Sequence, residues 1–81
     1  MTEEQLIELD FKKINVTADE SGSNAYYYYS LQLGNGYCNF STPANDEIHD
    51  NHWPVYEFNL MLETDDYEKL SQFIIAFNNL L

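Results

Sequence analysis

Positive charge is scarce in this chain of 81 residues. Three lysines and no arginine stand against 14 aspartates and glutamates, which gives a formal net charge of −11. Proteins that hold nucleic acid neutralise its phosphates with lysine and arginine, so this balance argues against direct nucleic-acid binding. A chain this acidic is instead suited to a basic partner, because electrostatic attraction speeds its association with a cationic surface.

Cysteine and long apolar runs are also scarce. Cys38 is the single cysteine, so an internal disulfide is excluded. No apolar run approaches the roughly 18 residues that a membrane span needs. The acidic first residues, Met-Thr-Glu-Glu, are the reverse of the basic opening of a secretory signal. We therefore expect a cytoplasmic protein that does not bind membranes.

The length and composition indicate one folded domain. A chain of 81 residues is too short for a second hydrophobic core, so we predict a single domain over residues 1–81. Hydrophobic residues make up 44% and aromatic residues 16%, which is too much apolar material for a disordered acidic tail.

Alternation of apolar and polar residues predicts four strands. It is present in residues 11–18, 25–33 and 55–62, and in the residues that follow Asn35-Gly36. An Asn-Gly pair is typical of a two-residue hairpin turn. This turn would pair Leu33 with Cys38 and Ser30 with Ser41.

Capping patterns predict a helix at each end of the chain. Thr2 and Gln5 have the spacing of a capping box before residues 3–9, and Asp65 and Glu68 have it before the last segment. Apolar residues recur with helical spacing from residue 67 to residue 81. The predicted fold is therefore α+β: a four-stranded antiparallel meander with a short N-terminal helix and a C-terminal helix packed on one face.

The C-terminal helix would bury one face of this sheet. The residues predicted on that face are Ile14, Val16, Tyr27, Tyr29, Leu31, Leu33, Cys38, Phe40, Tyr56, Phe58, Leu60 and Leu62. Tyr26 and Tyr28 would then stand on the uncovered face.

His49 and His52, beside Asp46, Glu47 and Asp50, are the residues that could ligate a metal ion. No zinc-protease motif accompanies them, and the segment lacks the glycine and terminal glutamate of a calcium loop. We interpret it as a solvated polar loop and predict neither a metal nor a cofactor.

Catalytic residues are not predicted either. Cys38 could act as a nucleophile with a histidine, but pairing with Leu33 places it on the buried face, where a thiol behaves as a small hydrophobe. Nucleophile elbows and phosphate-binding glycine loops are absent from the sequence. We therefore expect that the protein is not an enzyme.

The remaining candidates for function are surface residues. Tyrosine is frequent at interfaces because it is large, rigid and polar at its tip, but it also favours exposed strands for its β propensity alone. For Trp53 the alternative to partner contact is to close one end of the core. The predicted partner-binding residues are Tyr26, Tyr28, Tyr37, Asp46, Glu47, Asp50 and Trp53.

Three functional hypotheses follow. The leading hypothesis is a small non-enzymatic interaction protein that presents an acidic, tyrosine-rich surface to a basic protein partner. One alternative is a nucleic-acid mimic that inhibits a DNA- or RNA-binding protein, which would need carboxylates spaced like phosphates on one surface. The other is a homodimeric structural or accessory protein that uses the open sheet face.

Overall fold

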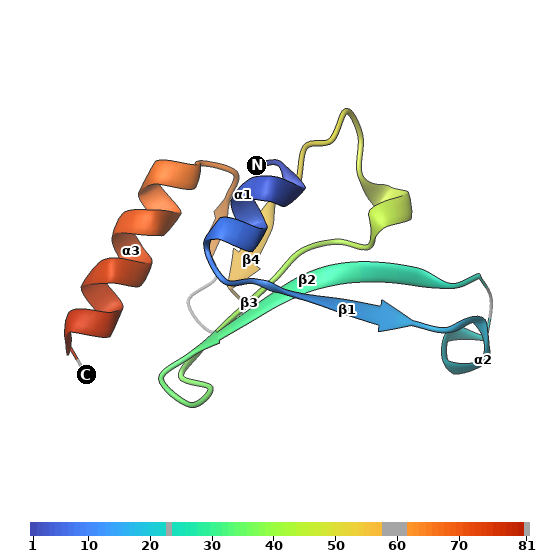
Figure 1. The fold of residues 1–81 in the computed structure, drawn as a ribbon, viewed down its shortest axis with the longest axis horizontal. Helices are drawn as coiled ribbons and strands as arrows, with labels where there is room; N and C mark the ends of the chain where they lie inside the picture. The colour runs from blue at the N-terminus through green and yellow to red at the C-terminus, as the bar shows by residue number, and fades with distance from the viewer. Residues whose placement is uncertain (23, 58–61, 81) are drawn as a thin grey trace.

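The computed structural model describes residues 1–22, 24–57 and 62–80. The elements are, in chain order, α1 (Glu3–Glu8), β1 (Lys12–Val16), α2 (Ala18–Ser21), β2 (Tyr26–Leu33), β3 (Cys38–Ser41), the 3-10 turn η1 (Asn45–Glu47), β4 (Val55–Glu57), β5 (Leu62–Thr64) and α3 (Tyr67–Leu80). The strands form one antiparallel sheet in the order β1-β2-β3-β4-β5 (Figure 1). The α+β class and the antiparallel meander are thus confirmed. No helix within the described ranges is both long and apolar enough to cross a membrane.

The number of strands differs from the prediction. The segment 55–62, predicted as one strand, contributes β4 and the first residue of β5, which pair antiparallel through Val55↔Thr64 and Glu57↔Leu62. β4 and β5 therefore run in opposite directions. Alternation of residues does not report such a reversal, because both arms of a hairpin keep the same period. The predicted core residues Phe58 and Leu60 lie outside the described residues.

The turn between β2 and β3 is the one predicted. Asn35 and Gly36 have φ values of 57° and 99°, the left-handed conformation that an Asn-Gly hairpin turn requires. Leu33 pairs with Cys38, and the register continues to Ser30↔Ser41. Turn chemistry and alternation agree here, which is why the sequence specifies this register.

The helix caps largely follow the sequence pattern. Gln5 N donates to Thr2 Oγ1 at 3.3 Å, and Thr2 N donates to Gln5 Oε1 at 3.0 Å, which completes the predicted capping box. At the start of α3, Lys69 N donates to Asp66 Oδ1 at 3.1 Å, one residue later than the predicted cap at Asp65. The short helix α2 was not predicted.

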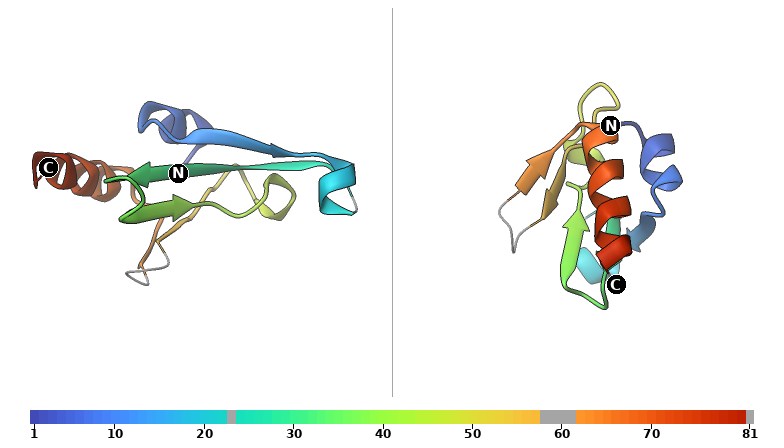
Figure 2. Two further views of the ribbon diagram at one scale, coloured as in Figure 1. Left: turned by 90° about the horizontal axis from the view of Figure 1, so that it is seen from below. Right: turned by 90° about the vertical axis from the view of Figure 1, so that its left-hand side faces the viewer.

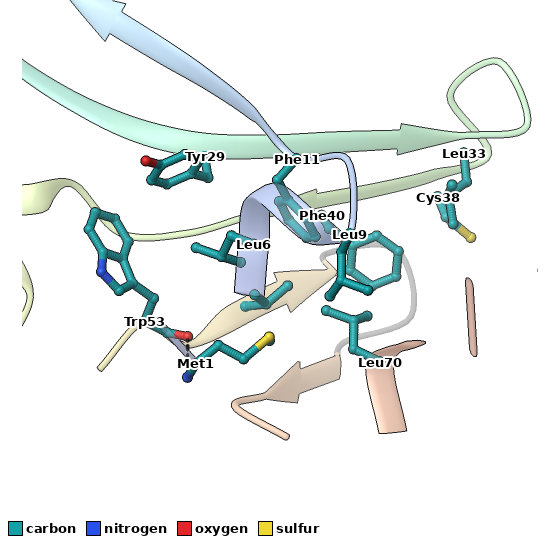
Figure 3. Packing of buried hydrophobic residues seen from close by; sticks show 11 residues of the cluster. Met1, Leu6, Leu9, Phe11, Tyr29, Leu33, Cys38, Phe40, Trp53 and Leu70 are labelled. Atoms are coloured by element: carbon teal, nitrogen blue, oxygen red, sulfur yellow. Dashed lines mark hydrogen bonds between the residues drawn. The ribbon is translucent and has the colours of Figure 1, made fainter. Parts of the chain in front are cut away.

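Two helices cover the same face of the sheet. The buried residues form one cluster that draws Leu6 and Leu9 from α1, Leu70 from α3, and Tyr29 and Phe40 from the sheet (Figure 3). α1 lies over the sheet, whereas α3 stands at one end of it, beside the β2–β3 turn (Figures 1 and 2). The C-terminal helix therefore covers only one end of this face, and not the whole face as predicted, because α1 occupies part of it.

The face assignment of β1 was wrong. Ile14 pairs with Tyr28 and Val16 pairs with Tyr26, so both aliphatic residues lie on the face opposite the helices. Alternation identifies residues that share a face, but only pairing with a neighbour decides which face that is.

The phase of β4 was also wrong. Tyr56 pairs with Ser41 and so lies opposite the helices, while Val55 and Glu57 are each only 1% exposed. Leu62, opposite Glu57 on the edge strand, is 47% exposed. Alternation predicted that Glu57 faces solvent, because burial of a carboxylate is ordinarily unfavourable. Since Glu57 is in fact buried, the predicted faces of β4 are exchanged.

Candidate functional site

The face of the sheet opposite α1 and α3 is uncovered. We call it the reverse face and define it by the register as Lys12, Ile14, Val16, Tyr26, Tyr28, Ser30, Gln32, Asn39, Ser41 and Tyr56. Each of these residues is half-buried or exposed, and none is fully buried. Tyr26 and Tyr28 therefore stand where the sequence places them, beside the aliphatic side chains of Val16 and Ile14.

The segment after β3 runs beside the first half of β2. Tyr29 N donates to Thr42 Oγ1 at 3.0 Å, and Thr42 N donates to Tyr29 O at 3.0 Å. Further along, Tyr27 N donates to Asn45 Oδ1 at 2.9 Å. These side chains take the places of strand partners for β2 after β3 has ended, and so fix η1 close to the tyrosines.

β2 and the β3–η1 segment border an open hollow of about 610 Å³ on the reverse face. Tyr26 and Tyr28 line it from β2, and Asp46 and Glu47 line it from η1. Its lining residues are Asn24, Tyr26, Tyr28, Ser41, Thr42, Pro43, Ala44, Asp46 and Glu47. We call this feature the acidic tyrosine hollow. Four of the seven predicted partner-binding residues meet there.

The tyrosine hydroxyls and the carboxylates of this hollow have no partners among the described residues. Within the described ranges, no hydrogen bond or ion pair engages the hydroxyls of Tyr26 and Tyr28 or the carboxylates of Asp46 and Glu47. The described residues that line the hollow include no lysine. These groups are therefore open to a ligand.

Tyr29 and Tyr67, in contrast, have hydroxyls that bond to glutamates of α1. Tyr29 Oη donates to Glu3 Oε1 at 3.1 Å, and Tyr67 Oη donates to Glu8 Oε2 at 3.0 Å. Burial, and then the bond to Glu3, raises the pKa of Tyr29 to about 12. The bond to Glu8 raises the pKa of Tyr67. These two tyrosines fasten α1 to β2 and to α3, a structural role.

Trp53, one of the predicted partner-binding residues, is buried, which agrees with the alternative that it closes one end of the core. It is only 2% exposed, and its ring lies 6.0 Å from that of Tyr27 and 5.3 Å from that of Tyr29. Trp53 N donates to Met1 O at 2.7 Å, and the Met1 amino group donates to Trp53 O at 3.2 Å (Figure 3). The indole therefore closes one end of the core, because burial of a large aromatic surface outweighs the polar character of its loop.

Tyr37 and Asp50 lie outside the acidic tyrosine hollow. Tyr37, next to the β2–β3 turn, is 79% exposed. Asp50 is exposed in the loop after η1 and has a left-handed φ of 56°. Neither lines the hollow, so both stay predictions for partner contact, with Tyr37 useful as a comparison.

The two histidines of the loop after η1, His49 and His52, contact other residues of the chain. His49 and His52 form an isolated antiparallel bridge, and His52 Nε2 lies 2.6 Å from Asp65 Oδ2. The hydrogen bond to His52 lowers the pKa of Asp65. Within residues 1–22, 24–57 and 62–80, no three histidine, cysteine, aspartate or glutamate side chains are grouped so that they could hold a metal ion.

Cys38 is buried, as its register predicts. Burial, and then the charge of Glu57, raises the pKa of the Cys38 thiol. A raised pKa keeps the thiol protonated, which disfavours nucleophilic chemistry.

Sequence reasoning missed the residues that build the hollow. Thr42 and Asn45 hold the β3–η1 segment against β2, and neither is among the predicted partner-binding residues. Their side chains bond to backbone groups 13 and 18 residues away in the chain, a distance at which residue type alone carries no signal. The general tendency of threonine and asparagine to bond to backbone groups was the only available indication.

Comparison of the chain with protein-family models, with curated proteins and with solved structures gives no match.

Proposed function

We propose that the protein is a non-enzymatic interaction module whose acidic tyrosine hollow binds a basic protein partner. One observation carries the proposal: two unengaged tyrosines and two unengaged carboxylates line a single hollow on the uncovered face of the sheet. A hollow with large aromatic side chains and a few polar groups is the kind of surface that holds an anchoring residue of a partner.

Charge supports a cationic partner. Asp46 and Glu47 bring two negative charges to the hollow, and the whole chain has a net charge of −11. A cationic side chain would find there both an opposite charge and the negative face of an aromatic ring. The long-range field would steer such a partner toward the protein and repel acidic competitors.

A peptide titration tests this proposal. The probe is a fluorescent, end-capped peptide in which glycine alternates with lysine and arginine, titrated with the protein at low and at high salt. We expect the affinity to fall as salt rises, since exposed charges are screened. The double variant Asp46→Asn with Glu47→Gln should bind about 3- to 10-fold more weakly, the effect of losing charge-assisted contacts at a partly exposed site.

The matched control is Glu4→Gln with Glu68→Gln. Both glutamates are exposed, neither lines the hollow, and the net charge changes by the same two units. We expect the control to bind almost as well as the unaltered protein. Equal weakening in the two double variants would contradict a site at the hollow, because the effect would then belong to net charge alone.

Homodimer formation through the reverse face is distinguished by the sign of its salt dependence. Two chains of net charge −11 repel one another, so self-association should strengthen with salt. Light scattering across the same salt range gives the mass. A dimer that forms at high salt, together with no peptide binding at low salt, would replace the basic partner with a second copy of the chain.

A further inference from the structure

We infer that the acidic tyrosine hollow is selective for arginine over lysine. This inference rests on the proposed function, and it names the side chain that a basic partner would insert. Its basis is the combination of flat aromatic rings and adjacent carboxylates in one open hollow of about 610 Å³.

The tyrosine rings of the hollow favour a flat cation. Tyr26 and Tyr28 lie on the same face of β2, two residues apart, and their cross-strand neighbours on that face are Val16 and Ile14. Both tyrosines are half-buried, so part of each ring surface is accessible from the hollow. A guanidinium is planar and can stack on a ring of this kind, whereas an ammonium contacts it as a compact, strongly hydrated charge.

The carboxylates of the hollow favour a cation with several donors. Asp46 and Glu47 are consecutive residues of η1, and both line the hollow. An arginine has five N–H donors in a fixed fork, which can serve more than one carboxylate oxygen while the plane of the group stays against an aromatic ring. Lysine has no such geometry. The lining therefore offers arginine two kinds of contact at once.

The opposite face of the same strand offers an internal comparison. Lys13 Nζ lies 4.0 Å from the centre of the Tyr27 ring, so a tyrosine of β2 on that side already has a cation from its own chain. Tyr26 and Tyr28 have no lysine beside them among the residues that line the hollow. Lys12 of the reverse face pairs with Ser30 and is not among the residues that line the hollow, so the hollow has the same type of ring but leaves the position of the cation to a partner.

The experiment compares two end-capped heptapeptides of equal charge, in which glycine alternates with three arginines or with three lysines. Binding of each is measured by calorimetry at one salt concentration. We expect the arginine peptide to bind about 2- to 5-fold more tightly, the advantage of one stacked cation at a partly exposed site. In Tyr26→Val with Tyr28→Val, which introduces β-branched residues that suit a strand, the preference for arginine should shrink, because only the contacts to the carboxylates remain.

Tyr37→Val is the matched control, because Tyr37 is exposed but lies outside the hollow. It should keep the preference for arginine. Circular dichroism of each variant establishes that the sheet is retained.

The outcomes separate the two claims. Equal affinity of the unaltered protein for both peptides, with weaker binding in Asp46→Asn with Glu47→Gln, would overturn arginine selectivity and leave the proposed function standing. An arginine preference that stays undiminished without Tyr26 and Tyr28 would also overturn the inference, since the aromatic rings would then contribute nothing to it. Failure of both peptides to bind would overturn the proposed function and the inference together.

Discussion

At the scale of single residues, the tyrosines of β2 have two different roles. Tyr29 is buried and donates its hydroxyl proton to Glu3, whereas Tyr26 and Tyr28 are half-buried and their hydroxyls bind no described residue. The division follows from the period of a strand, which sends successive side chains to opposite faces. One face of the tyrosine run stabilises the fold, and the other is available for contact.

Removal of the Tyr29 hydroxyl should therefore affect stability but not binding. We expect Tyr29→Phe to lower the free energy of unfolding by about 1 kcal/mol, the usual contribution of one hydrogen bond. Tyr26→Phe, which removes a hydroxyl without a described partner, is the control and should leave stability unchanged. Urea titration followed by circular dichroism measures both. Equal losses in the two variants would contradict the division of roles.

Alkaline pH should weaken the fold through the same residue. The pKa of Tyr29 is raised from 10.0 to about 12. Because the folded state holds this proton more tightly, the contribution is complete below pH 10 and is lost as the pH rises toward 12. In a titration followed by ultraviolet absorbance, one phenol of the folded protein should ionise near pH 12, and this step should be missing in Tyr29→Phe. Its persistence in that variant would assign the step to another tyrosine.

At the scale of elements, the β2–β3 turn packs against α3 through Gly34 and Phe77. Gly34 has a φ of 61°, and a Cβ atom added there would lie 2.9 Å from the Phe77 ring. The turn thus needs glycine for two reasons, its backbone conformation and the close approach of the helix. Alternation and the Asn35-Gly36 pair predict the turn, but they do not report what packs against it.

A pair of glycine substitutions separates these two reasons. Gly22 has a φ of 75° and open space around its would-be Cβ, so Gly22→Ala should cost about 1 kcal/mol for conformation alone. Gly34→Ala should cost more, because the Phe77 ring must also move. Denaturant unfolding measures both variants. Equal costs would mean that α3 does not press on the turn.

Elements with local signals were predictable, and elements set by distant contacts were not. The Thr2 and Gln5 cap and the register of β2 with β3 depend on residues near one another in the chain, and both were correct. The faces of β1 and β4 depend on their neighbours in the sheet, and both were wrong. The hollow combines the two cases: its tyrosines follow from alternation, but its walls depend on the distant bonds of Asn45 and Thr42 to β2.

At the scale of the whole molecule, net charge is the dominant property. With 14 acidic side chains and three lysines, few carboxylates can be compensated within the chain. Self-repulsion of this kind destabilises a compact state and is screened by salt. Salt should therefore stabilise the folded protein while it weakens the binding of a basic partner.

Thermal unfolding at low and high salt tests whether salt stabilises the folded protein. We expect the midpoint temperature to rise with sodium chloride, and a gain of about 1 kcal/mol from screening would raise it by about 4–8 °C in a domain of this size. Coincident unfolding curves at the two salt concentrations would mean that the acidic groups are too dispersed to repel one another.

The position of a basic ligand on the folded protein is the most direct measurement. The isotopically labelled chain is titrated with the arginine heptapeptide at low salt, and the amide resonances are followed by nuclear magnetic resonance. Binding at the acidic tyrosine hollow predicts the largest shifts at Tyr26, Tyr28, Asp46 and Glu47, with little change along α1 and α3. Shifts concentrated on those helices, or spread evenly over all acidic residues, would contradict a binding site on the reverse face.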